Sequence, residues 1–350
     1  MCLVTLKNLK TTVMGKKIFL LIFLSLSISV VLKAQQTELS IQTGHVAAIN
    51  KIVFSTDGNF LASSDDQNKI CIWDMSGLTQ MASFFYSDLD TNDRISLLAF
   101  SLDNKKLIAG TLSGNILVLD IGKSEKIRGF PTGKKITKLL FINNSTCLIL
   151  SSSLLSLNLN NYSISEIYNG DVADLYFNKN NNELIFCTFS GDIGKITQQD
   201  GIRIQLTDTN MNNLKKRLSN KYSGIARIKL TDKIIVASNF YNLRFYDFAS
   251  KRKVYSASMP YMDERITDIE YLPQNNYFIV SNTDGKIYVY DCHKSKLVKI
   301  LKLHISEVNS LAVHPTKNLF ASGSSDRSII LWDAITLKPI KRFYSRASSI

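Results

Sequence analysis

Runs of alternating apolar and polar residues cover most of the chain and follow one repeated template. Each copy has an alternating run, a polar turn, a second apolar run ending in small residues, and a third alternating run. Alternation with a period of two gives a β-strand one buried face, so each run predicts a strand. The first two runs of the seven copies span residues 46–64, 94–111, 135–152, 171–188, 224–239, 265–282 and 307–324.

The third run of each copy ends in a polar residue, usually one suited to a turn. These residues are Asp74, Asp120, Asn160, Thr197, Asp247, Asp291 and Asp333. Their spacing scatters around the roughly 40–45 residues of a four-stranded propeller blade. A fourth strand is expected after each, for instance over 81–86, 126–130 and 297–301. We therefore predict an all-β fold for residues 35–350, a seven-bladed β-propeller of four-stranded antiparallel blades.

The turns between the first two runs of each copy are rich in Asp, Asn and Gly. Examples are Asp57-Gly58, Asp103-Asn104 and Asn275-Asn276. These residue types tolerate the positive φ that tight hairpins require. The turns therefore support hairpins between neighbouring strands of each blade.

The first and last copies share polar and aromatic residues at matching places. In the last copy these residues are His304, Ser322, Asp326 and Trp332, followed by Asp333. In the first copy they are His45, Ser63 and Trp73, followed by Asp74. Both copies resemble WD repeats, and by period the resemblance extends over about residues 36–350. The middle five copies lack the His and the Trp.

The resemblance to WD repeats implies a structural role for these residues. In that family a His, a Ser, an Asp and a Trp of one blade form a hydrogen-bonded tetrad. A buried indole N–H and a buried imidazole both need partners, which is the physical reason for the set. In the first copy Gln67 stands where the acid should fall, and Asp66 lies beside it.

The resemblance also bears on how the ring is joined. In WD-repeat propellers the N-terminal strand often completes the last blade. Residues 38–42 and 338–344 both suit that place, and only one of them fits there. We expect 38–42 to take it.

Residues 1–34 have the order of a secretory signal, which predicts an N-terminal signal helix before the propeller. Lys16 and Lys17 precede an uncharged run over 18–32, and Ala34 follows it. Basic start, apolar run and small residue are the three parts of such a signal. The run is shorter than the roughly 20 residues of a spanning helix. We predict cleavage after Ala34, with Met14 as the alternative start and an uncleaved anchor as the alternative fate.

A cleaved signal places the folded part in a periplasm, on a cell surface or outside the cell. The formal net charge of the whole chain is +13, and removing residues 1–34 leaves 37 basic and 29 acidic residues, or +8. A moderate positive field suits acidic partners and anionic envelope surfaces. Nucleic-acid binding would need a basic stripe with aromatic residues beside it, and only short clusters are present. We expect no nucleic-acid partner.

The residue types that carry chemistry do not form a recognisable catalytic or metal-binding pattern. The five cysteines have neither metal-clip spacing nor a disulfide framework, so we interpret them as isolated thiols. Two of the four histidines belong to the implied tetrads. No nucleophile elbow, phosphate loop or zinc-protease motif appears. We predict no catalytic residue, no metal and no cofactor.

The longest connection between copies runs over residues 208–223. Long loops on rigid scaffolds tend to carry function. Its candidate partner-contact residues are Leu214, Lys215, Lys216, Arg217 and Tyr222. A tolerated insertion is the alternative interpretation.

These observations favour a non-catalytic protein-interaction scaffold of the cell envelope or exterior. The partner is an unidentified protein or peptide, and a closed ring leaves no obligatory edge to pair, so we expect a monomer. One alternative is a propeller that senses a ligand or a carbohydrate. Another is an exported hydrolase or lactonase, since a fold alone does not settle function.

Overall fold

The computed structural model describes two long parts of the chain and, between them, several separate strands. The described residues are 44–86, 93–170, 172–178, 183–188, 193–197, 203–208, 227–230, 234–238, 242–247, 252–258, 265–292 and 296–344. They lie within one compact unit, Thr43–Ser345. They contain β-strands and no helix, which confirms the all-β class. The predicted signal segment, 1–34, lies outside them.

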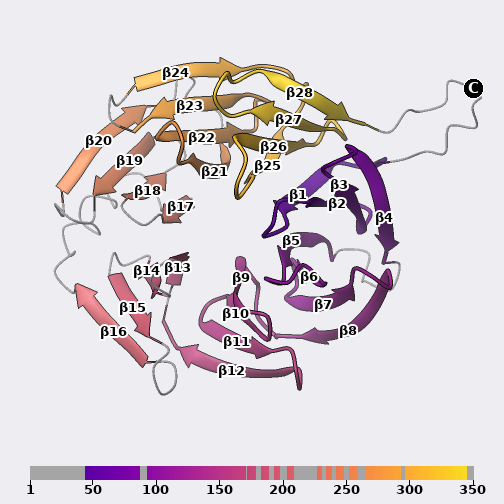
Figure 1. Cartoon of the computed structure of the whole chain (residues 1–350). Helices are drawn as coiled ribbons and strands as arrows, with labels where there is room; N and C mark the ends of the chain where they lie inside the picture. Colours follow the sequence, from indigo (N-terminus) through magenta and orange to yellow (C-terminus); the bar gives the residue numbers. More distant parts are fainter. Residues whose placement is uncertain are drawn as a thin grey trace, which may run out of the picture. The chain divides into compact units, whose positions relative to one another are not determined.

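The described strands form seven four-stranded antiparallel sheets, one for each predicted copy (Figure 1). The first two sheets contain β1 (Ile49–Phe54), β2 (Phe60–Asp65), β3 (Lys69–Asp74), β4 (Thr79–Phe85), β5 (Ile95–Phe100), β6 (Lys106–Thr111), β7 (Asn115–Asp120) and β8 (Glu125–Pro131). The third and fourth contain β9 (Lys138–Asn143), β10 (Thr146–Leu150), β11 (Leu154–Asn158), β12 (Ser163–Tyr168), β13 (Val172–Asn178), β14 (Glu183–Thr188), β15 (Ile193–Thr197) and β16 (Arg203–Asp208).

The last three sheets complete the series. They contain β17 (Arg227–Leu230), β18 (Ile234–Ser238), β19 (Asn242–Asp247), β20 (Arg252–Ser258), β21 (Ile266–Leu272), β22 (Tyr277–Asn282), β23 (Ile287–Asp291), β24 (Lys296–Leu301), β25 (Val308–Val313), β26 (Leu319–Ser324), β27 (Ile329–Asp333) and β28 (Pro339–Phe343). Within each sheet the strands pair in chain order, so every sheet is a meander.

The turns follow the residue chemistry expected from the sequence. Gly58, Asn104 and Asn276 have positive φ angles of 76°, 57° and 52° in the turns between first and second strands. At the ends of third strands a side-chain oxygen accepts a hydrogen bond from the turn backbone, as Asp74 Oδ1 does from Ser76 N at 3.0 Å. In the third sheet Asn158 has this role. The predicted strand end at Asn160 is therefore two residues too late.

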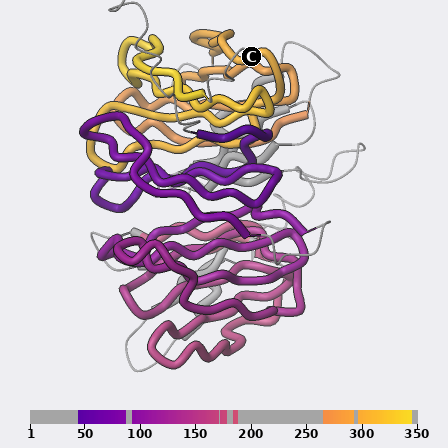
Figure 2. The backbone as a smooth tube through the Cα atoms, turned by 90° about the vertical axis from the view of Figure 1, so that its right-hand side faces the viewer, coloured from indigo at the N-terminus to yellow at the C-terminus, as the bar shows by residue number. Residues whose placement is uncertain are grey.

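The first strands of the sheets line the inside of a closed ring. Each inner strand contacts the inner strands of the sheets before and after it, and β25 of the last sheet contacts β1 of the first. Figure 2 shows the first sheet, in indigo, directly beside the last sheet, in yellow. We call the contact between β1 and β25 the join.

Five inner strands carry an extra residue in their pairing with the second strand. These residues are Asn50, Ser96, Ala173, Thr267 and Asn309. Such a bulge redirects side chains, so a residue and its successor can face the same side. Three bulge residues donate a hydrogen bond to the first carbonyl of the next inner strand: Asn50 to Ile95 at 3.4 Å, Asn309 to Ile49 at 2.7 Å, and Thr267 to Val308.

The last sheet is completed by the C-terminal segment. Strand β28 pairs with β27, with Phe343 opposite Ile329. The prediction that residues 38–42 take this place is therefore wrong, and those residues lie outside the described part of the chain. The turn explains the outcome, because Asp333 Oδ1 accepts hydrogen bonds from Ile335 N and Thr336 N at 3.0 and 2.6 Å. A tight local turn closes a shorter loop than a strand from the other end of the chain.

The core consists of apolar layers between successive sheets. The layer across the join includes Ile52, Leu61 and Trp73 of the first sheet with Leu331 and Phe343 of the last. Further layers lie between the first and second, second and third, third and fourth, and sixth and seventh sheets. Because both faces of most sheets are covered, burying these layers drives ring closure as well as sheet formation.

Candidate functional site

Four polar side chains of the last sheet meet in one hydrogen-bonded chain. His304 precedes β25, Ser322 lies on β26, Asp326 lies in the turn after it, and Trp332 lies on β27. His304 Nδ1 lies 2.9 Å from Asp326 Oδ2, and His304 Nε2 lies 2.8 Å from Ser322 Oγ. Trp332 Nε1 donates to the same Ser322 Oγ at 2.8 Å. The structure thus brings together the four residues predicted for this copy.

The acid of this tetrad is held in its ionised form. Burial alone would raise the pKa of Asp326. Hydrogen bonds from His304, from Ser328 and from the backbone N–H of Ile305 outweigh that cost and leave the pKa well below its usual range. An ionised Asp326 favours the tautomer with a proton on His304 Nδ1, so that Nε2 accepts from the Ser322 hydroxyl.

The first sheet holds an equivalent tetrad with a different acid. His45 Nε2 lies 2.6 Å from Ser63 Oγ, and Trp73 Nε1 donates to Ser63 Oγ at 2.8 Å. The acid is Asp65, whose Oδ2 lies 2.7 Å from His45 Nδ1.

The sequence comparison of the two copies had pointed to the wrong place for this acid. It placed Gln67 at the acid position with Asp66 beside it. Asp65 and Ser63 are two apart on strand β2, and alternation points both toward the same face. Asp66 points elsewhere and pairs with Arg94 at 2.9 Å.

Neither tetrad is arranged for nucleophilic catalysis. Ser63 and Ser322 are completely buried. Each hydroxyl is already engaged by an imidazole and an indole. A nucleophile needs access to a substrate carbonyl, so a His, a Ser and an Asp in this setting fix the strand ends and turns instead.

The last tetrad also fixes an exposed apolar residue. The backbone N–H of Ile305 donates to Asp326 Oδ2 at 3.2 Å, while its side chain is 88% exposed. Leu303 and Val46 are exposed close to the two tetrad histidines in sequence. We call the loops at this end of the sheets the tetrad face.

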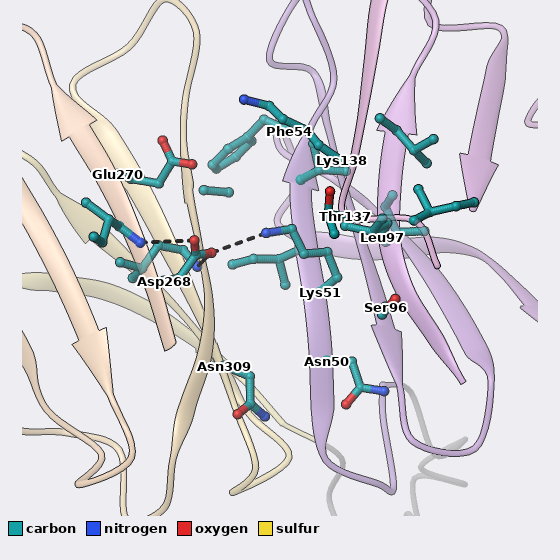
Figure 3. Close-up of a pocket in the computed structure, with 18 of the residues that line it drawn as sticks. Asn50, Lys51, Phe54, Ser96, Leu97, Thr137, Lys138, Asp268, Glu270 and Asn309 are labelled. Atoms are coloured by element: carbon teal, nitrogen blue, oxygen red, sulfur yellow. Dashed lines mark hydrogen bonds and ion pairs between the residues drawn. The ribbon is translucent and has the colours of Figure 1, made fainter. Parts of the chain in front are cut away.

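A second candidate site is a cavity of about 990 Å³ lined by the inner strands. Bulges turn consecutive residues such as Asn50 and Lys51 toward it (Figure 3). Lys51 Nζ of the first sheet lies 3.2 Å from Asp268 Oδ2 of the sixth sheet. The same oxygen accepts from Leu311 N of the seventh sheet at 3.0 Å, so one carboxylate links three sheets.

A second ion pair faces the same cavity. Lys138 of the third sheet pairs with Asp174 of the fourth and donates to Leu175 O at 2.6 Å. Sequence reasoning missed both pairs. The signal was available, because Lys51, Asp174 and Asp268 each follow the bulge of their copy and Lys138 begins β9. Charges of opposite sign therefore recur at one repeat position.

The described side chains show the state of four cysteines and whether a metal-binding cluster is present among them. Cys71, Cys147, Cys187 and Cys292 are buried and free, as the sequence indicated. Burial raises the pKa of the Cys147 thiol to about 12, so it stays protonated. Among the described residues, no three His, Cys, Asp or Glu side chains gather to hold a metal ion.

One further prediction concerns residues beyond the described part of the chain. Loop residues Leu214, Lys215, Lys216, Arg217 and Tyr222 lie outside the described residues. No helix long and apolar enough to cross a membrane occurs in the described residues.

Comparison with known families matches the two copies that contain the tetrads. The model of the WD domain, G-beta repeat, matches residues 36–74 and 295–333. Two segments of the chain therefore match the WD40 repeat model. They contribute the sheets on either side of the join, so both tetrads lie next to it.

Known proteins with WD repeats are similar to part of this chain. A WD repeat-containing protein of Dictyostelium discoideum is 30% identical over 115 residues, which is 32% of this chain and 22% of that protein. WD repeat-containing protein 74 of Bos taurus is 30% identical over 97 residues, 28% of this chain and 25% of that protein. The match spans about a quarter of the length of these relatives.

The sheets between the two segments that match the WD40 model use other polar groups where a tetrad would lie. In the second sheet, Asp93 accepts hydrogen bonds from Ser113 N at 2.9 Å and from Asn115 Nδ2 at 2.9 Å. In the sixth, Tyr288 donates to Asp284 at 2.7 Å. Different side chains thus brace the same turns without the His and Trp of a WD40 repeat.

Proposed function

We propose that this chain is an exported, non-catalytic scaffold, a seven-bladed propeller that binds another protein or peptide on its tetrad face. The observation that carries the proposal is the exposed Ile305 side chain on a backbone fixed by Asp326. An apolar anchor held in place loses little conformational entropy when a partner covers it. Covering such a side chain contributes roughly 2 kcal/mol.

The repeat architecture supports the same role. Proteins built from WD repeats generally act as protein-interaction scaffolds. A closed ring of stacked sheets presents its turns as a fixed surface, because most of the sheets are packed on both faces. Export to a periplasm, cell surface or exterior rests on the sequence of residues 1–34, and the monomeric state rests on ring closure.

A ligand-sensing or carbohydrate-sensing role is the second candidate. The cavity of about 990 Å³ favours it, because Asn50, Ser96 and Thr137 line it with uncharged polar groups. Ligand sites of this size combine apolar walls with a few polar groups that fix orientation.

A crosslinking pull-down from envelope extract tests the scaffold role, with the full chain as bait. Ile305→Asp changes the tetrad face. Ile335→Asp is the matched control, because this exposed isoleucine lies in the turn at the opposite end of β27. A third bait replaces Lys215, Lys216 and Arg217 with Glu.

The proposal expects defined proteins on the parent bait, loss with Ile305→Asp, and retention with Ile335→Asp. Loss only with the 215–217 variant would move the contact to that loop. Capture of no defined protein contradicts the scaffold role. A thermal-shift screen with glycans then tests the cavity.

A further inference from the structure

The outer strands of the sixth and seventh sheets lie next to each other on the outside of the unit. Figure 1 shows β24 and β28 following one another along the outer rim. A hydrogen bond links β24 to the turn before β28, because Lys299 Nζ donates to Leu337 O at 2.9 Å. The two strands therefore present one continuous strip of surface.

This strip is basic and contains no acid of its own. Neither 296–306 nor 334–345 includes an Asp or a Glu. Its exposed lysines are Lys296, Lys299, Lys302, Lys338 and Lys341. A sixth cation, Arg342, is neutralised by Asp326 at 2.9 Å. We call these five lysines and the apolar residues between them the basic strip.

Aliphatic side chains stand between the lysines. Leu297, Val298 and Ile340 are 38%, 45% and 49% exposed. Among the described outer strands, β8 also has exposed cations, Lys126 and Arg128, beside the exposed Ile127, but it begins with an acid, Glu125. Strand β4 has no basic residue, and β12 has an acid and no base.

Lysines on a free strand edge disfavour pairing with another strand. The strip is therefore poorly suited to accept a peptide as a fifth strand. Nucleic-acid sites combine cations with aromatic stacking surfaces, and between these lysines the strip is mainly aliphatic. Lysine stems that lie along apolar surface with the ammonium group outward suit the boundary of a lipid bilayer.

We propose that the basic strip docks the protein on an anionic lipid bilayer. The lysines would lie at the headgroup phosphates, and Leu297, Val298 and Ile340 would enter the boundary of the acyl region. This goes beyond the scaffold role, because it uses a different surface and a lipid partner. It leaves the tetrad face at one end of the sheets open to proteins.

Vesicle co-sedimentation of the full chain tests the proposal. The vesicles contain phosphatidylcholine with or without 30% phosphatidylglycerol. The strip variant carries Lys296→Glu, Lys338→Glu and Lys341→Glu. The control variant carries Lys105→Glu, Lys123→Glu and Lys126→Glu, three exposed lysines of the second sheet, and so changes the net charge equally.

The expected result is preferential binding to the anionic vesicles that the strip variant weakens at least tenfold, since each lysine near a lipid surface contributes roughly fivefold. The control variant should stay within about threefold of the parent. Ile340→Ser should weaken binding at high salt, where the electrostatic part is screened.

Three outcomes overturn the proposal. The first is no preference for the anionic vesicles. The second is an equal loss in both triple variants, which would show attraction by net charge alone. The third is binding of the parent to RNA, with the same strip dependence, without binding to vesicles. The pull-down with Ile305→Asp tests the tetrad face, whereas the vesicle experiment tests the basic strip. The scaffold proposal and the membrane proposal can therefore fail independently.

Discussion

Single residues decide how the first tetrad is built. Asp65 ends strand β2, and its carboxylate accepts from the backbone N–H groups of Gln67 and Lys69 at 3.0 Å each, besides contacting His45. One buried carboxylate thus fixes a turn and an imidazole together. Asp66, its neighbour, pairs with Arg94 near the surface.

Replacing each of these neighbours by Asn separates their roles. Asp65→Asn should lower the free energy of unfolding by about 2 kcal/mol, because a buried charge-assisted network is weakened. Asp66→Asn should change it by less than about 0.5 kcal/mol, as for other exposed pairs. Urea denaturation measures both. Equal effects would mean that Asp65 does not act as the tetrad acid.

The resemblance to WD repeats identified the His, Ser and Trp of both tetrads, and their spacing is the same in the two copies. It missed Asp65 because spacing alone does not show which residues of a turn point inward. It also missed Asp93, which is buried although it follows several other polar and acidic residues in the sequence. Burial of a single acid depends on the neighbouring strands, which a one-dimensional pattern does not place.

Among the elements, two hairpin turns meet across the join. His314, in the turn after β25, donates through Nε2 to Gly58 O at 3.0 Å. Its Nδ1 accepts from Thr316 N at 3.2 Å and Lys317 N at 2.9 Å. Gly58 has no alternative, because its φ is 76° and an added Cβ would lie 2.1 Å from the imidazole. The contact therefore requires a neutral imidazole and a glycine.

This contact predicts a pH dependence of stability. Burial lowers the pKa of His314 below 6.5, and Lys317 lowers it further, although the Gly58 carbonyl and Asp57 act in the opposite direction. The unfolded chain binds the proton more readily, so the free energy of unfolding falls as the pH drops below 6.5 toward the lower folded pKa. Above 6.5 this contribution is fully present.

Urea denaturation between pH 7.5 and 5 measures the slope. His314→Gln should be less stable at pH 7.5 and should lose less stability on acidification. A slope identical to that of the parent would remove His314 as its source.

At the level of elements, the sequence predicted the strand order and most turns, because alternation and turn residues are local. The ion pairs between inner strands could not be predicted from one copy at a time. Lys51 and Asp268 are far apart in the chain and meet only because the ring closes. The sequence also did not show that β28, and not residues 38–42, completes the last sheet. That outcome depends on the geometry of the turn at Asp333, which the residue pattern does not give.

For the whole molecule, the join is the place where ring closure can be measured. Phe343 of β28 packs on Trp73 of the first sheet, with ring centroids 5.1 Å apart. Phe343→Ala should cost about 3 kcal/mol, since it opens a cavity between the two sheets. Phe85→Ala is the control, because Phe85 is the last residue of β4 and its side chain is 64% exposed. Its effect should stay below about 0.5 kcal/mol in the same denaturation experiment.

The join also sets how the unit responds to mechanical load. Between the described strands of the first and last sheets there is no backbone ladder. The contact includes side-chain packing and three hydrogen bonds, Asn309 to Ile49 O, Ile52 N to Ser310 Oγ, and His314 to Gly58 O. Tension applied between residues 44 and 344 would act directly on this contact. We expect the first and last sheets to separate first, because the backbone hydrogen bonds within each sheet would still hold its strands together.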